Sequence, residues 1–340
     1  METRRRHLTV PMGAILLLGM VMAASPALSG NLEPPGPPAP SMKPLDAVEP
    51  RTPISSLPFT ISQEGSYYLT GDLTASGSSS GITIVGSATH VTLDLKGYSL
   101  IGAGAANTSG ITINNGANVS VRNGTVREWA NGIVSNGGPM IKMMDLTAKN
   151  NVHHGFALYG GGEVLDSVAM GNGEVGIYVY GSAIVRNSQA IQNSWTGIWV
   201  QQDGLVEDCL AEGNGGSGPS YDRQWRAGIT TQFASKVIGC RVQSNAGDGI
   251  YLGDCNHVTG NTATMNGLSG ITSEFGHINR IEANQLWNNS GYGIFLSSNL
   301  NLLLRNTARG NTMGNFQIPF GNTAPIETGT VSNPASNVSF

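Results

Sequence analysis

The chain has 340 residues, of which only 12% are charged, and its formal net charge is −4. It contains no basic segment as large as a nucleic-acid-binding surface requires, so we do not expect nucleic acid as a partner. Glycine is abundant, at 47 residues, but it follows no strict three-residue period, which excludes a collagen-like structure.

Residues 1–29 have the features of a secretory signal peptide. Arginines at positions 4–6 precede an apolar segment over residues 12–24, which is shorter than the about 20 residues that a membrane-spanning helix needs. Small residues before Gly30 fit a cleavage site. We therefore predict an exported protein, located in the periplasm, outside the cell or on its surface, with no transmembrane segment.

Residues 30–53 are predicted to form a proline-rich linker. Eight of the 16 prolines lie between Pro34 and Pro53, and such a segment is extended and cannot build a hydrophobic core. The predicted folded domain therefore comprises residues 54–340.

This domain consists of a short repeat, and the commonest interval between its copies is 21 residues. Alternating apolar residues within each copy favour short strands, and glycines and asparagines favour turns. Each copy opens with a marker glycine that is followed by isoleucine or phenylalanine: Gly81, Gly110, Gly132, Gly155, Gly176, Gly197, Gly228, Gly249, Gly270 and Gly293.

Positions at a fixed distance before the marker glycine keep one type of side chain. One column holds Val164, Val185, Val237, Val258 and Ile281, and another holds Asn151, Asn172, Asn193, Asn245, Asn266 and Asn289. Like residues in register indicate stacked coils, each of which buries the core of its neighbour. The columns predict an all-β, right-handed parallel β-helix of about 11 coils. We expect positive φ at the marker glycines and a hydrogen-bonded asparagine ladder in a left-handed turn position.

The predicted domain also resembles a known family over nearly its whole length. The segment from Phe59 to Gly102, which includes "FTISQEGSYYLTGDL" and "VTLDLKGYSLIG", is similar to the N-terminal cap and first coil of secreted right-handed parallel β-helix repeat proteins. The tail "GNFQIPFGNTAPIETGTV" resembles their C-terminal coil. Pectate-lyase-like and NosD-like proteins share these repeats. The resemblance implies the fold, whereas the activity must be argued from a site.

Aromatic residues concentrate on the predicted outward side of the first strand of each coil, which we call the first-strand face. A row of exposed rings is a surface on which sugar rings pack. Polysaccharide-active β-helices place their cleft on this face, so the resemblance points the same way. Cross-strand pairs of rings also stabilise a sheet without any ligand, and both interpretations stay open. The predicted substrate-binding residues on this face are Tyr159, Tyr178, Tyr180, Trp199 and Tyr251.

An insertion of about ten residues interrupts the repeat within residues 213–228. Long loops on a rigid scaffold often carry binding groups. We expect Trp225 to join the substrate-binding rings, and Arg223 and Arg226 are candidates to bind a sugar carboxylate. The alternative is a tolerated loop with solvated charges.

The candidate catalytic residues are Asp248, Glu174, Asp222 and Arg226. Hydrolysis of a glycosidic bond needs two carboxylates about 5–10 Å apart, and an aspartate next to a glycine, such as Asp248, more often serves a turn. The sequence "RIE" at residues 280–282 lacks the lysine of the Arg-Ile-Lys motif of polygalacturonases. The sequence therefore does not predict polygalacturonase activity.

No cofactor or metal site is expected. His153 and His154 are adjacent, and neighbouring residues on a strand point to opposite faces, so they do not suggest a shared metal. Cys209 and Cys240 occupy one column in consecutive coils, at a spacing that a disulfide tolerates. Parallel stacked side chains favour free thiols instead.

The leading hypothesis is an exported, monomeric β-helix that binds a polysaccharide on its first-strand face. Polysaccharide lyase or glycoside hydrolase activity is a candidate addition to this binding. The alternative is a non-catalytic surface rod with a structural or adhesin-like role, which the absence of a paired catalytic motif favours.

Overall fold

The structure, a computed structural model, describes residues 51–104, 108–219, 222–319, 325–328 and 333–340. The predicted signal peptide and residues 30–50 of the predicted linker lie outside these ranges. The strand β1 (Thr52–Ile54) begins within the segment that we assigned to the linker. It pairs in parallel with β3 (Gly65–Leu69), so residues 52–53 already belong to the first coil.

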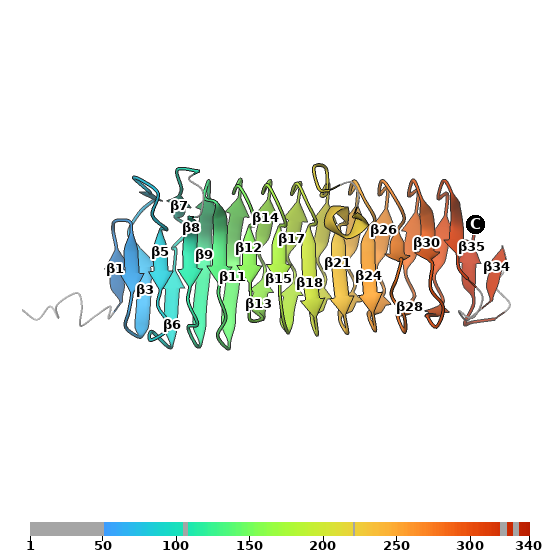
Figure 1. The fold of residues 1–340 in the computed structure, drawn as a ribbon, viewed down its shortest axis with the longest axis horizontal. Coiled ribbons are helices and arrows are strands. Elements are labelled where there is room, and N and C mark those ends of the chain that lie inside the picture. The colour runs from blue at the N-terminus through green and yellow to red at the C-terminus, as the bar shows by residue number, and fades with distance from the viewer. Residues whose placement is uncertain (1–50, 105–107, 220–221, 320–324, 329–332) are drawn as a thin grey trace, which may run out of the picture. The chain divides into compact units, whose positions relative to one another are not determined.

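The described residues form coils that stack in register, and each complete coil contributes three short strands (Figure 1). The strand that follows the marker glycine belongs to a parallel sheet of 12 strands, the first sheet. Its strands are β2 (Phe59–Ile61), β5 (Ile82–Ile84), β8 (Ser109–Ile113), β10 (Asn131–Ser135), β12 (Phe156–Leu158), β15 (Ile177–Val179), β18 (Ile198–Gln202), β21 (Ile229–Phe233), β24 (Ile250–Asp254), β27 (Ile271–Ser273), β30 (Tyr292–Leu296) and β33 (Gly314–Gln317).

The other 23 strands form one sheet, because β9 (Val119–Arg127) and β11 (Ile141–Lys149) run without a break through two faces of the coil. With parts of β9 and β11, the second face contains β1, β3, β6 (Val91–Asp94), β13 (Gly162–Leu165), β16 (Ala183–Arg186), β19 (Leu205–Glu207), β22 (Lys236–Ile238), β25 (His257–Thr259), β28 (Arg280–Glu282) and β31 (Leu302–Leu304). With the remainder of β9 and β11, the third face contains β4 (Leu73–Thr74), β7 (Ser99–Ile101), β14 (Val168–Met170), β17 (Gln189–Ile191), β20 (Leu210–Glu212), β23 (Arg241–Gln243), β26 (Thr262–Thr264), β29 (Gln285–Trp287), β32 (Thr307–Arg309), β34 (Ile326–Thr328) and β35 (Asn337–Ser339).

The predicted stacking of like residues is confirmed. Val164 pairs with Val185, which pairs with Val206 in the next coil, and Val237 and Val258 continue the column. All five are fully buried. Parallel strands lie about 4.8 Å apart, so each inward side chain rests on its equivalent and one core runs through the stack. In the described residues, a first sheet of 12 strands corresponds to about twelve coils, in agreement with the prediction of about 11.

The predicted asparagine ladder is also confirmed. Asn193 Nδ2 donates to Asn214 Oδ1 at 2.9 Å and to Ala169 O at 3.0 Å. Its Oδ1 accepts from the backbone N–H and the side-chain amide of Asn172, at 3.1 and 2.8 Å. The same arrangement extends from Asn151 to Asn311. The ladder satisfies buried backbone groups that water cannot reach.

The ladder asparagines do not adopt the left-handed conformation that we predicted for them. Instead, the residue before each of them has positive φ, for example Gln192 at 51° and Gly171 at 63°. The chain thus turns one residue before the asparagine. The asparagine side chain can then form hydrogen bonds with the coils on both sides.

The marker glycines also differ from their predicted role. From Gly81 to Gly293, none of the described marker glycines has positive φ. A Cβ atom on Gly176 would lie 2.6 Å from Asn193 Nδ2 and 2.7 Å from Gly197 O. Glycine is needed here because the neighbouring backbone and ladder amide leave no space for a side chain.

Cys209 and Cys240 are buried, and both are free thiols, which is the state that the parallel stacking of their side chains favours. Each thiol donates to a carbonyl of the preceding coil, at 3.4 Å to Val185 O and 3.6 Å to Val206 O. A hydrogen bond with Cys209 and burial raise the pKa of Cys240 well above its usual value, so this thiol stays protonated.

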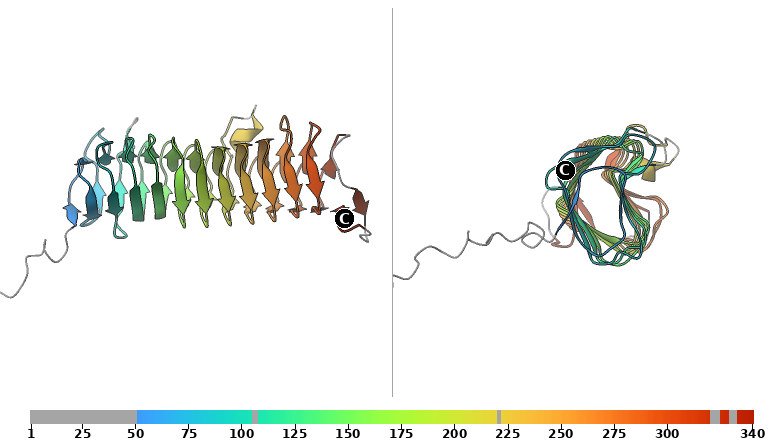
Figure 2. Two further views of the ribbon diagram at one scale, coloured as in Figure 1. Left: turned by 90° about the horizontal axis from the view of Figure 1, so that it is seen from below. Right: turned by 90° about the vertical axis from the view of Figure 1, so that its left-hand side faces the viewer.

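The inserted loop carries η1 (Arg223–Arg226), one turn of 3-10 helix. Figure 2 shows the coils stacked along one axis, with η1 projecting from the side of the stack. Within the described ranges, no helix combines the length and the apolarity that crossing a membrane requires.

Replacing Asn193 by alanine should destabilise the fold strongly, because it removes four hydrogen bonds and leaves the buried N–H of Asn172 without an acceptor. We expect a loss of about 2–4 kcal/mol in the free energy of unfolding, measured by urea denaturation. Asn136→Ala is the matched control, since Asn136 makes an exposed amide–amide bond, and it should cost less than about 1 kcal/mol. Equal losses in both variants would show that the ladder has no special role.

Candidate functional site

A row of rings lies on the outward side of the first sheet, over β12, β15 and β18. His154 stacks on Tyr178 with ring centroids 5.5 Å apart, and Tyr159 lies 5.7 Å from Tyr178. Tyr178 is 6.3 Å from Trp199, and Trp225 from the inserted loop is 4.0 Å from Trp199. Successive rings come from successive coils, so this aromatic row follows the axis of the stack.

The rings on the first-strand face, which include Tyr180 as well as the aromatic row, differ in exposure. Tyr159 and Tyr180 are 46% and 47% exposed, and Tyr178 is partly exposed. Trp199, which we expected to be exposed, is only 2% exposed because Trp225 covers it. The surface open to a ligand is therefore formed by the three tyrosines and the outer side of Trp225.

The inserted loop is held against the first sheet by Arg223. Its Nε donates to Asp248 Oδ2 at 2.8 Å and its Nη2 to Asp248 Oδ1 at 2.5 Å. Nη2 also donates to Thr272 Oγ1 at 3.1 Å, and the guanidinium lies 5.2 Å from the ring centre of Phe295. Burial lowers the pKa of Arg223, but the hydrogen bond and charge of Asp248 outweigh burial and raise it. One arginine thus ties the loop to the next three coils.

Asp248, the first catalytic candidate, serves as the anchor of this loop. Its side chain is fully buried. Besides Arg223, its Oδ1 accepts from the Ser269 N–H at 2.9 Å and from Thr272 Oγ1 at 2.7 Å. Because the side chain is fully buried and both carboxylate oxygens accept from protein donors, Asp248 is not placed to take a proton from a substrate.

The arginines of the loop have partners within the protein. Arg226 Nε donates to Gly215 O at 3.2 Å, inside the loop, and Arg223 is bound to Asp248. These contacts remove the reason to expect either arginine to bind a sugar carboxylate, and Arg226 keeps the loop closed on itself.

Glu174 lies beside the aromatic row, between two histidines. Its Oε1 is 3.0 Å from His153 Nδ1, and its Oε2 is 3.4 Å from His154 Nε2. The histidines lie before β12 and not within a strand, so the strand rule that placed them on opposite faces does not hold here. Burial lowers the pKa of His154, against the opposing effect of Glu174. Among the described side chains, no group of three or more His, Cys, Asp and Glu is arranged to hold a metal ion.

A cavity of about 490 Å³ opens where the loop meets the first sheet, and we call it the acidic cavity. Asp222, which caps η1, and Tyr251 on β24 both line it. Glu274 and Phe275 follow β27, and Asp254 ends β24. The sequence predicted Tyr251 on the first-strand face, but it did not predict that Asp222 lies near Tyr251, because the path of the loop is not periodic.

The charges around this cavity are mostly negative. Burial raises the pKa of Tyr251 to about 12, and the charges of Glu274, Asp222 and Asp248 add to this effect. The lining residues include one basic side chain, Arg223, whose charge is balanced by Asp248. The Tyr251 hydroxyl therefore stays protonated and can act as a hydrogen-bond donor.

The two carboxylates that we first selected on this face are too far apart to work together. Three coils separate Glu174 from Asp248, which corresponds to about 14 Å at about 4.8 Å per coil. This exceeds the about 10 Å that separates paired carboxylates in glycosidases. Asp222 and Glu274, by contrast, line one cavity.

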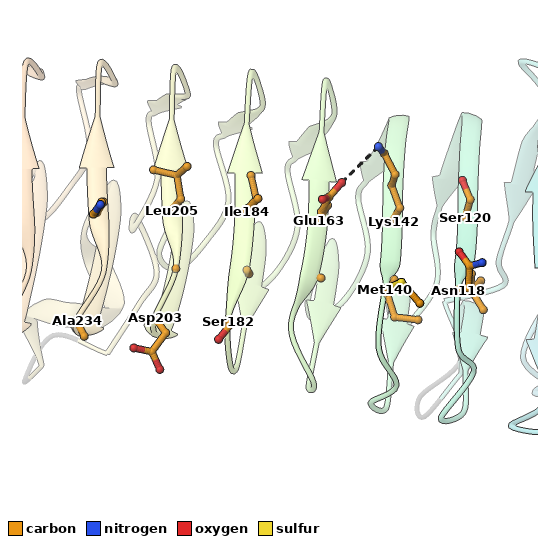
Figure 3. A pocket seen from close by; sticks show the side chains of 16 residues that line it. Asn118, Ser120, Met140, Lys142, Glu163, Ser182, Ile184, Asp203, Leu205 and Ala234 are labelled. Atoms are coloured by element: carbon orange, nitrogen blue, oxygen red, sulfur yellow. Dashed lines mark ion pairs between the residues drawn. The ribbon is translucent and has the colours of Figure 1, made fainter. Parts of the chain in front are cut away.

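A larger hollow, of about 850 Å³, lies on the second face (Figure 3). Its lining includes the ion pair of Lys142 and Glu163, at 3.3 Å, and the apolar side chains of Ile184 and Leu205. No aromatic ring is among its lining residues in the described part of the chain. For this reason we place the candidate site on the first-strand face, although the hollow there is smaller.

The fold and this surface define a parallel β-solenoid with a ring-lined face and an adjoining acidic cavity. The family model described as "Right handed beta helix region" matches residues 109–224 and 164–313, which together cover more than half of the chain. The chain belongs to this family, and the predicted right-handed parallel β-helix is confirmed.

Several solved structures have the same fold as this chain. The A-module of the mannuronan C-5 epimerase AlgE4 from Azotobacter vinelandii matches with a TM-score of 0.65 and 15% identity, over 81% of this chain and 90% of that one. The Dettilon tailspike protein matches with a TM-score of 0.55 and 15% identity, over 85% and 61%. The catalytic domain of a GH87 α-1,3-glucanase in complex with tetrasaccharides matches with a TM-score of 0.52 and 13% identity, over 85% and 63%. A comparison with curated proteins gives no match.

Replacing Arg223 by glutamine should release the inserted loop, because Asp248 is then a buried carboxylate without its cation. We expect a loss of about 3–5 kcal/mol in the free energy of unfolding. We also expect red-shifted tryptophan emission from the native protein, as Trp199 becomes uncovered.

Arg186→Gln is the control for this substitution. It breaks a more exposed pair with Glu207 and should cost less than about 1 kcal/mol without a change in emission. An unchanged emission spectrum in Arg223→Gln would contradict the anchoring role.

Proposed function

We propose that the first-strand face binds a polysaccharide, which lies along the stack over the aromatic row and reaches the acidic cavity. The observation that carries this proposal is the exposure of Tyr159, Tyr178 and Tyr180 on the same face as that cavity, with Tyr178 three coils from Tyr251 on the cavity lining. Sugar rings pack their C–H faces on aromatic rings, while polar groups fix their orientation. Because equivalent side chains recur about every 4.8 Å along the stack, the surface suits an extended polymer.

Two further points support a carbohydrate ligand. One structural neighbour is named as an epimerase of mannuronan, and another is a glucanase in complex with tetrasaccharides. The predicted signal peptide would bring the protein to polymers outside the cytoplasm. Export is part of this proposal, and it would appear as a chain that lacks residues 1–29 outside the cytoplasm.

Tyr178→Ala and Tyr180→Ala should each weaken polysaccharide binding about tenfold, since each removes a stacking surface worth about 1.4 kcal/mol. A glycan array identifies the ligand, and calorimetry measures its affinity. Trp287→Ala is the control, because Trp287 is 40% exposed but lies on β29 of the third face. Unchanged binding in both tyrosine variants, or no binding to any glycan, would contradict the proposal and favour the non-catalytic rod.

A second candidate function is hydrolysis of the bound polysaccharide. The observation that favours it is the presence of two carboxylates, Asp222 and Glu274, in one cavity. Asp222 belongs to the inserted loop, and Glu274 follows β27. Glycoside hydrolysis needs one carboxyl group to protonate the leaving oxygen and a second to act as base or nucleophile.

If the protein hydrolyses its ligand, Glu274→Gln and Asp222→Asn should each lower the release of reducing ends at least about 100-fold. Asp203→Asn is the control, since Asp203 is an exposed acid with positive φ, a conformation that asparagine tolerates. No release by the unaltered protein would refute hydrolysis and leave the binding function standing.

A further inference from the structure

We infer that the first-strand face selects polysaccharides that carry no carboxylate or sulfate groups, and that polyuronates are not its ligands. This inference rests on the proposed function and narrows its ligand class. It is carried by the kinds of group that line the acidic cavity and by the partners of the nearby cations.

The cavity presents three carboxylates to a ligand. Asp222, Asp254 and Glu274 all line it. The Asp222 side chain accepts hydrogen bonds from the N–H and the side-chain amide of Gln224 in its own loop. Asp254 accepts from the His277 N–H at 2.6 Å. In the part of the chain that the structure describes, neither Asp222 nor Glu274 forms an ion pair with a basic side chain.

The cations close to the cavity offset these charges only in part, since the charge of Arg223 acts on Glu274 as well as on Asp248. Arg223 lines the cavity, but it makes two hydrogen bonds to the buried Asp248. Arg226 points back to Gly215 O. His277 lies 3.5 Å from Asp254 and is charged only when protonated. Counting Arg223 against Asp248, the remaining charge on the lining at neutral pH is that of three carboxylates.

The aromatic row carries the same sign of charge. Glu174 lies beside Tyr159. Burial raises the pKa of Tyr159, and the charge of Glu174 raises it further. The partners of Glu174 are His153 and His154, and burial lowers the pKa of His154. A polymer with an acid on every sugar would therefore meet negative groups at both ends of the site.

Hydrogen-bonding capacity leads to the same conclusion. An ionised carboxylate only accepts hydrogen bonds, so a wall of three carboxylates needs a ligand that brings donors. Sugar hydroxyls and ammonium groups are donors, whereas a uronate or sulfate adds another acceptor-only anion. The resulting repulsion is strongest in a cavity, where the surrounding protein lowers the dielectric constant.

The test compares oligosaccharides of equal length in one calorimetric series at pH 8, where an ordinary histidine is neutral. The probes are neutral glucan and mannan oligomers, a glucosamine oligomer, and oligomers of mannuronate and galacturonate. We expect at least one neutral or amino-sugar oligomer to bind about tenfold more tightly than either uronate at low ionic strength. Added salt should narrow this difference, because it screens the repulsion.

Variants that each remove one negative charge test whether the cavity causes the selectivity against uronates. Glu274→Gln and Asp222→Asn should each strengthen uronate binding several-fold, whereas Asp203→Asn on the second face, with the same change in net charge, should leave it unchanged. Uronates that bind as tightly as the neutral oligomers, or uronate binding that Glu274→Gln does not alter, would overturn this inference while the proposed function stands. If no polysaccharide binds at all, both are wrong.

Discussion

The structure depends on the hydrogen bond that passes from one coil to the next through a buried asparagine. At each step the side-chain amide of one coil donates to the amide oxygen of the following coil, for example from Asn193 to Asn214 at 2.9 Å. The same oxygen, Asn214 Oδ1, accepts the backbone N–H of Asn193, which water cannot reach. Both bonds require coils of one size in one register, and they require glycine where the backbones approach, as at Gly176. The regular repeat follows from this geometry.

This constraint acts on the inside of the coil and leaves the outside free to vary. The insertion leaves the coil just after Asn214, yet Asn214 still donates to Asn245 at 3.0 Å across it. The added residues therefore bulge outward without disturbing the ladder. Held by Arg223 and Asp248, they cover Trp199 and form one wall of a cavity on the first sheet. A rigid stack with one anchored loop is thus sufficient to produce a shaped site.

The same anchor accounts for the electrostatic character of the site. Asp248 looked like a catalyst because it is an acid on the aromatic face, but its burial demands a cation, and Arg223 supplies it. The arginine is then no longer available for an anionic ligand, while Asp222 and Glu274 remain on the lining. The negative charge of the cavity thus follows from the ion pair between Arg223 and Asp248, which holds the loop in place.

Much of the fold followed from the sequence alone, because inward positions repeat and the repeat is visible as columns such as Val164, Val185 and Val237. The ladder was predictable for the same reason, although Asn214 escaped notice where the insertion shifts the spacing. Conformation within the turns was not predictable, since the positive φ at Gln192 and the close approach at Gly176 depend on the neighbouring coil. For the site, the sequence predicted only the face of the coil on which it lies. Which rings stay open, which acid is buried and which acids share a cavity depend on where a non-periodic loop docks, and contacts between side chains of different coils decide that in three dimensions.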